Sequence, residues 1–195
     1  NLWLARAPRV RLAGNVLRDQ ALLVSGLLVE QLGGPSVFAY QPDGLWEEAS
    51  NARYTPGKGA DLYRRSLYTY WKRTLAPPTM ALLDAGDREY CSVKPRHTNT
   101  PLQALTLMNE PTFVEAARKL AGRMLTGGGS TDAERIAFAF RIVTSRAPTS
   151  AESQVLTAAL ADYRREFPAG PKAELAATTA LANVLLNLEE FTTRD

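Results

Sequence analysis

Residues 100–111 read Thr-Pro-Leu-Gln-Ala-Leu-Thr-Leu-Met-Asn-Glu-Pro, a stretch that contains both a helix start and a helix break. Thr100 suits the residue before a helix, Pro101 suits its first position, and Gln103 can complete the reciprocal hydrogen bonds of a capping box. Pro111 then kinks or restarts the helix, because proline has no N–H to donate. The stretch therefore predicts the opening of a helical region.

The same capping pattern recurs further along the chain. Thr131 with Glu134 and Thr149 with Glu152 predict two more helix starts, and a last helix is expected over 172–190. Apolar residues recur at helical spacing in these segments, as in Phe113, Ala117, Leu120 and Met124, in Ile136, Phe140 and Val143, in Leu156 and Leu160, and in Leu181, Leu185 and Leu188. Short, well-capped helices joined by short turns indicate an antiparallel bundle over 100–190.

A further helix is expected over 8–32, before this bundle. Its apolar stripe would comprise Leu12, Val16, Leu23 and Leu27, with Leu17, Val24 and Leu28 beside it. The opposite, solvated face would carry Arg9, Arg11, Arg18 and Asp19. Gly33 would end the helix in a left-handed cap conformation.

Residues 33–99 interrupt the helical pattern. Glycine and proline punctuate 33–61, which predicts a long loop. The aromatic content of 63–73 favours a strand, although Tyr63, Leu67 and Tyr70 also fit a helical period. Turns and short extended pieces are expected over 79–99. The sequence thus predicts a mainly α protein, a bundle of about six helices with a small β or irregular central insertion, as one domain over 1–195.

Composition narrows the classes of function. The chain is 45% hydrophobic and 22% charged, as globular domains are, and no apolar run is long enough to span a membrane. Its one cysteine, Cys91, and one histidine, His97, exclude an internal disulfide, a Cys-rich zinc site and the two-cysteine attachment of a c-type haem. We therefore expect no cofactor in this chain, and a buried, inert Cys91.

The excess positive charge is concentrated in one segment. Residues 61–100 carry seven basic and four acidic side chains, so this segment accounts for the whole net charge of +3. Its candidate ligand-binding residues are Arg64, Arg65, Tyr68, Tyr70, Trp71, Lys72, Arg73, Arg96, His97 and Asn99.

Three interpretations of these basic and aromatic residues remain open. They could bind an anionic polysaccharide, with arginine on the anion and a ring on the sugar face, or they could bind single-stranded nucleic acid. They could equally form a core strand whose arginines pair with nearby carboxylates. A pI of only about 9.1 and the absence of a longer basic run argue against nucleic acid.

Asp84 and Asp87 are candidate metal ligands, since alternating carboxylates around a glycine can form a calcium loop. The spacing of an EF-hand is not present, and Asp-x-Gly-Asp is also ordinary turn chemistry, in which Asp84 caps a turn and Asp87 pairs with an arginine. An enzymatic alternative would place a hydrolase or redox site around Asp84, Asp87 and His97.

Several motifs together resemble one family. They are Arg-Arg-Ser-Leu-Tyr-Thr-Tyr-Trp-Lys-Arg-Thr at 64–74, Asp-Ala-Gly-Asp-Arg-Glu at 84–89, Thr-Asn-Thr-Pro-Leu-Gln-Ala-Leu at 98–105 and Asn-Glu-Pro-Thr-Phe-Val at 109–114. The chain resembles a planctomycete-specific C-terminal domain of unknown function, found in planctomycete proteins that carry a cytochrome c-type domain. It departs from that pattern around Ala85, where the family more often has Phe and Pro as neighbours.

The resemblance implies a C-terminal fragment of a longer, exported protein, periplasmic or extracellular, with any signal peptide and further modules upstream. It implies no catalytic residues. We therefore expect a non-catalytic module that docks onto upstream domains or a partner, or that binds an anionic polysaccharide.

Overall fold

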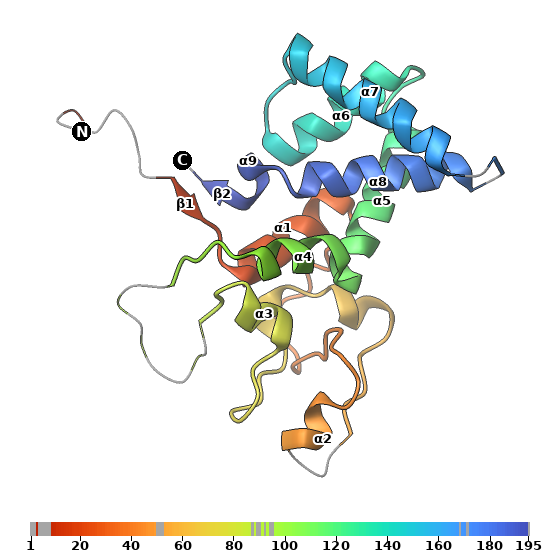
Figure 1. Cartoon of the computed structure of the whole chain (residues 1–195). Coiled ribbons are helices and arrows are strands. Elements are labelled where there is room, and N and C mark those ends of the chain that lie inside the picture. The colour runs from red at the N-terminus through yellow and green to blue at the C-terminus, as the bar shows by residue number, and fades with distance from the viewer. Residues whose placement is uncertain are drawn as a thin grey trace.

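The computed structural model describes residues 3, 9–49, 53–86, 88, 91, 93, 96–167, 169–170 and 172–194, and it is mainly helical (Figure 1). Six longer helices form the frame of the described part: α1 (Gly14–Ser25), α4 (Pro101–Asn109), α5 (Pro111–Gly127), α6 (Asp132–Thr144), α7 (Ser150–Glu166) and α8 (Ala173–Leu186). Three short ones accompany them: α2 (Leu45–Ala49), α3 (Pro78–Leu82) and α9 (Glu189–Thr192). The predicted fold class is confirmed.

The core lies where α5 packs against both α8 and α1, while α7 packs against α8 and α6 (Figure 1). From α5 it receives Phe113, Leu120 and Met124, and from α8 it receives Leu181 and Leu185, all buried. Full burial of such a side chain stabilises the fold by about 1.5–3 kcal/mol relative to exposure. The apolar stripes expected in the second half of the chain thus face one another.

Local capping sets the helix boundaries in this half. The side chains of Thr100, Thr131 and Thr149 each accept a hydrogen bond from the third residue of the helix that follows, and all three capping boxes are closed. Glu110 ends α4 and caps α5, so the chain restarts at Pro111. The last helix is shorter than expected, because α8 stops at Leu186 and the chain then turns into α9.

The helix expected over 8–32 is wrong at both ends. Val10 and Arg11 form β1, which pairs antiparallel with β2 (Thr193–Arg194). The helix ends at Ser25 because Gly26 adopts φ 78°, a left-handed conformation that glycine reaches without strain. The chain then runs extended, and the N–H of Val29 donates to the carbonyl oxygen of Tyr63 at 3.0 Å.

The strand expected over 63–73 is also wrong. The segment forms two 3₁₀ turns, Gly59–Tyr63 and Ser66–Tyr68, with isolated single-residue bridges around them. The physical reason is Arg18, whose buried guanidinium donates to the carbonyl oxygens of Leu62 (2.6 Å) and Arg64 (2.9 Å). The carbonyl oxygen of Arg64, and that of Leu62 just before the segment, are therefore bound by a side chain of α1 and not by a neighbouring strand.

Two arginines connect the helices at the surface of the bundle. Arg146 forms ion pairs with Glu152 and Glu190, each at 2.6 Å. Arg164 forms ion pairs with Asp132 at 2.5 Å and Glu174 at 2.6 Å. These pairs fix α6, α7, α8 and α9 in relation to one another, since each guanidinium contacts carboxylates from two segments.

The Arg146 network predicts a loss of stability in acid. Hydrogen bonds from Arg146, with that from the Thr149 backbone, lower the pKa of Glu152 to about 2. A carboxyl whose pKa is lower in the folded than in the unfolded state stabilises the fold above the unfolded pKa of about 4.3, and this contribution is lost as the pH falls toward 2. Thermal unfolding can be followed by circular dichroism at several values between pH 6 and pH 2. As the pH falls, the melting temperature of Glu152→Gln should therefore decrease less steeply than that of the wild type. If the melting temperatures of both proteins decrease equally with pH, the ionised carboxylate of Glu152 is not the source of the acid sensitivity.

None of the helices within the described residues is both long enough and apolar enough to cross a membrane.

Candidate functional site

Arg64 is a structural residue rather than an exposed ligand-binding one. Its side chain is buried, and its guanidinium donates to the carbonyl oxygens of Pro35 (2.9 Å), Gln31 (3.1 Å) and Gly33. The guanidinium also lies 3.9 Å from the centre of the Tyr68 ring. Tyr68 in turn accepts a hydrogen bond from the N–H of Gly33 at 2.9 Å. Together these two predicted ligand residues hold the loop that follows α1.

The remaining residues of 65–73 differ in their exposure. Tyr70 stacks on Phe38 with ring centroids 4.9 Å apart, and Lys72 Nζ lies 4.6 Å from the ring centre of Trp46. Trp71 is partly covered by the Arg88 guanidinium at 4.7 Å. Exposed residues in this segment include Arg65, Tyr70 and Arg73. The segment therefore combines rings that anchor loops with a few accessible cations.

Of the two candidate metal ligands, the structure describes Asp84. Asp84 Oδ2 accepts hydrogen bonds from Thr98 N and Oγ1 (each 2.7 Å) and from Gln103 Nε2 (3.1 Å). Burial raises the pKa of Asp84, but these hydrogen bonds and the nearby His97 outweigh it and lower the pKa below its ordinary value. These partners lie 14 and 19 residues further along the chain, so the carboxylate of Asp84 holds the approach to α4 and not its own turn. Asp87 lies outside the described residues, among which no group of three or more His, Cys, Asp or Glu side chains could hold a metal ion.

The residues just before α4 are exposed. Arg96, His97 and Asn99 lie on this stretch, and Asn99 Oδ1 accepts a hydrogen bond from Arg11 at 3.2 Å. The expectation of a buried cysteine is wrong, because Cys91 is exposed. The described residues on either side of it, Arg88 and Val93, are exposed as well, so Cys91 has no described core beside it in the chain.

Gln103 connects α4 to the Asp84 turn. Its buried Nε2 donates to Leu82 O (2.9 Å), Thr98 Oγ1 (2.8 Å) and Asp84 Oδ2, while its Oε1 accepts from Thr100 N at 3.3 Å. The motif at 98–105 thus specifies local structure, because the side chain of Gln103 forms hydrogen bonds with four surrounding residues.

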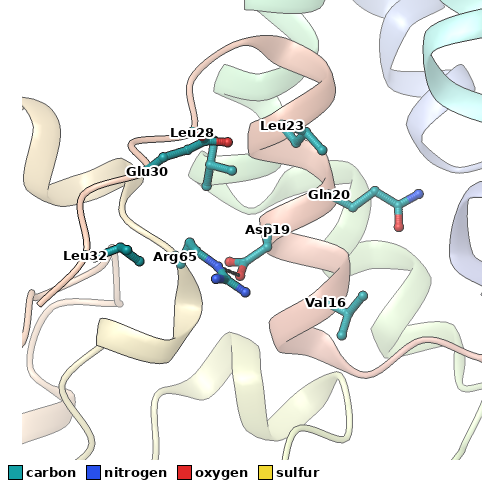
Figure 2. A pocket seen from close by; sticks show the side chains of 8 residues that line it. All are labelled: Val16, Asp19, Gln20, Leu23, Leu28, Glu30, Leu32 and Arg65. Atoms are coloured by element: carbon teal, nitrogen blue, oxygen red, sulfur yellow. Dashed lines mark ion pairs between the residues drawn. The ribbon is translucent and has the colours of Figure 1, made fainter.

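A groove lies beside α1, next to Arg65 of the basic segment (Figure 2). It has a volume of about 600 Å³ and is called the α1 groove from here on; its lining is Val16, Asp19, Gln20, Leu23, Leu28, Glu30, Leu32 and Arg65. Figure 2 shows the Asp19–Arg65 pair between α1 and the extended chain of Leu28, Glu30 and Leu32. Arg65 is therefore the one predicted ligand residue in this lining.

The α1 groove combines exposed apolar side chains with the charged side chains of Asp19, Glu30 and Arg65. Val16, Leu23 and Leu32 are 43%, 56% and 80% exposed. Arg65 Nε lies 3.7 Å from Asp19 Oδ2, and Asp19 Oδ1 also accepts a hydrogen bond from Ser66 N at 2.6 Å. Such a surface can bury apolar side chains while its charges select orientation.

Sequence reasoning missed this groove because it assigned Val16 and Leu23 to a buried stripe. Leu17, Ala21 and Val24 form the buried face instead, and Arg18 turns inward with them. The signal that could have found it was Gly26, which breaks the apolar run and lets the chain fold back beside the helix.

The fold defines a class: a small, mainly helical domain with an exposed groove beside α1. The family comparison is more specific. The model of the family PSD1, described as a protein of unknown function (DUF1553), matches residues 1–160, so the chain belongs to this family. Comparisons with curated proteins and with solved structures give no match.

Proposed function

We propose that this chain is a non-catalytic interaction domain that docks onto a polypeptide segment through the α1 groove. The observation that carries the proposal is the gathering of Val16, Leu23 and Leu32, all exposed, around one hollow of about 600 Å³. Single exposed apolar residues are ordinary, but contiguous apolar surface marks an interaction site.

The charges of the groove indicate what it would bind. Asp19 and Glu30 place two carboxylates in the lining against the single guanidinium of Arg65. An apolar segment carrying a basic side chain near Glu30 would complement this excess of negative charge. We propose that the segment belongs to the upstream part of the same polypeptide. The resemblance to planctomycete cytochrome c-associated domains supports such an exported, modular protein.

Hydrogen exchange tests this docking. The full-length polypeptide should exchange the amides of residues 16–32 at least about tenfold more slowly than the 195-residue chain does, because docking excludes solvent and suppresses local opening. The double variant Leu23→Asp, Leu32→Asp should remove this difference. Val155→Asp, a change of an equally exposed residue on α7, should leave it intact. Equal exchange of 16–32 in the two proteins would overturn the proposal.

Binding of an anionic polysaccharide is a second candidate, supported by one observation. Tyr70 is 40% exposed and stacked on Phe38, next to the Lys72–Trp46 contact and the exposed Arg73. A sugar ring could stack on Tyr70 while its carboxylate or sulfate meets the cations. Arg64 is not included in this site, since its guanidinium donates to backbone carbonyls.

Calorimetric titration with polygalacturonate at low ionic strength tests this candidate. Tyr70→Ala with Arg73→Ala should weaken binding at least about fivefold, as expected for losing a ring contact and a charge contact. Arg141→Ala, which removes an exposed cation on α6, should not. If the wild type does not bind polygalacturonate, binding of an anionic polysaccharide is excluded as a candidate function.

The alternative of a hydrolase or redox site around Asp84, Asp87 and His97 receives less support. The Asp84 oxygen that would serve a metal or a proton transfer already accepts three hydrogen bonds.

A further inference from the structure

A second hollow, which shares no lining residue with the α1 groove, lies where three segments meet. It has a volume of about 330 Å³ and is lined by Tyr40, Gln41, Pro42, Pro78, Thr79, Leu82, Thr106, Glu110 and Pro111. Three of these residues are prolines, whose rings give flat apolar walls, and the volume lies at the lower end of the range for small-molecule sites. We call it the proline pocket.

The polar groups of the proline pocket are mostly satisfied within the protein. Tyr40 donates its hydroxyl proton to Glu115 at 2.8 Å, and Thr106 donates its own to Leu102 O at 2.8 Å. The Glu110 carboxylate accepts from Thr112 N (2.9 Å) and Thr112 Oγ1 (3.0 Å) as the cap of α5. These groups therefore present little unmet hydrogen-bonding capacity.

Gln41 is the exception. Its Nε2 is buried and has no hydrogen-bond partner in the described structure. A buried donor without an acceptor is unfavourable by about 1–3 kcal/mol, so such a group is rare unless something supplies the acceptor. The terminal amide torsion of glutamine is soft, and its rotation can present the N–H groups to the hollow.

We infer that the proline pocket binds a small, uncharged, ring-containing molecule whose carbonyl oxygen accepts a hydrogen bond from Gln41. The ring would pack on Pro42, Pro78 and Pro111, and the carbonyl would satisfy the unpartnered donor. An anion is disfavoured, because the Glu110 carboxylate lines the same space. The inference does not depend on docking at the α1 groove.

A titration followed by ¹H–¹⁵N NMR tests this inference with three matched probes: N-methylbenzamide, ethylbenzene and benzoate. N-methylbenzamide should shift the amides of 40–41, 79–82 and 106–110, and should bind at least about fivefold more tightly than ethylbenzene, which lacks the carbonyl, or benzoate, which is charged. Gln41→Leu should abolish the preference over ethylbenzene. Gln154→Leu, the same change at an exposed position of α7, should keep it.

Two results would overturn the inference. One is that N-methylbenzamide shifts no residue of the proline pocket at 10 mM, on the order of the weakest useful affinity for a ligand of this size. The other is that Gln41→Leu binds N-methylbenzamide as tightly as the wild type does. Thr79→Phe, which should fill the hollow from α3, provides a second check: it should eliminate the shifts while the spectrum of α5–α8 stays folded.

Discussion

Replacement of Arg18 by methionine is expected to lower the free energy of unfolding by about 3–5 kcal/mol, the range for breaking a buried charged network. The Arg18 side chain is 2% exposed and lies inside the fold rather than on the solvated face of α1. It donates to Leu62 O, Arg64 O and Ser66 Oγ (3.3 Å). Methionine retains apolar volume but leaves these acceptors without a donor, and each unsatisfied buried group is unfavourable by about 1–3 kcal/mol.

Urea denaturation at pH 7, followed by circular dichroism, measures this loss. Arg141→Met is the matched control, because Arg141 lies exposed on α6 and its replacement should change stability by no more than about 0.5 kcal/mol. Burial lowers the pKa of Arg18 and Asp19 opposes this, but an arginine remains charged at neutral pH. If the two variants unfold at the same urea concentration, Arg18 does not organise the 62–66 turns.

The second large effect is expected from Arg64→Met, at about 2–4 kcal/mol, for loss of several charge-assisted hydrogen bonds and of the stacking on Tyr68. Arg64 binds the carbonyl oxygens of Gln31, Gly33 and Pro35, so the chain that carries Leu32 should loosen as well. Limited proteolysis should therefore cut residues 29–36 faster in this variant, in addition to the lower midpoint in urea.

The neighbouring arginine gives a sharp control. Arg65 is 51% exposed in its side chain and forms one long ion pair with Asp19, so Arg65→Met should cost no more than about 1 kcal/mol. A similar destabilisation by both changes would contradict the assignment of Arg64 to the structure and Arg65 to the surface.

The second half of the fold could be predicted from sequence because its information is local. The two residues that form each capping box lie within four consecutive residues of the sequence. Pro111 likewise marks the first residue of α5. Apolar spacing then places Leu120 and Leu181 on the faces that meet. Short-range signals of this kind need no knowledge of the rest of the chain.

The first half could not be predicted in the same way, because long-range contacts override its local preferences. The aromatic run at 63–73 favours a strand, yet Arg18, more than forty residues earlier, binds the carbonyl oxygen of Arg64 and that of Leu62 just before the run. Val10 would extend a helix by pattern, but it pairs with Arg194 at the other end of the chain. Nothing near either segment in sequence indicates its partner.

The candidate site, too, was predictable only where local sequence signals determine it. Arg65 was one of ten candidate ligand-binding residues in the basic segment, and it lines the α1 groove. The sequence did not separate Arg64 from Arg65, since adjacent arginines look alike until the backbone places one inside and one outside. The exposure of Leu23 depends on the turn at Gly26, which apolar spacing alone does not reveal.

Site-specific photo-crosslinking tests whether the α1 groove docks an upstream segment of the same polypeptide. Leu23→p-benzoyl-phenylalanine is introduced into the full-length protein, and Val155→p-benzoyl-phenylalanine serves as the control. Docking should give an intramolecular cross-link from position 23 to one apolar segment upstream of this chain, mapped by mass spectrometry, and none from position 155. Absence of a cross-link from position 23, or the same products from both positions, would contradict it.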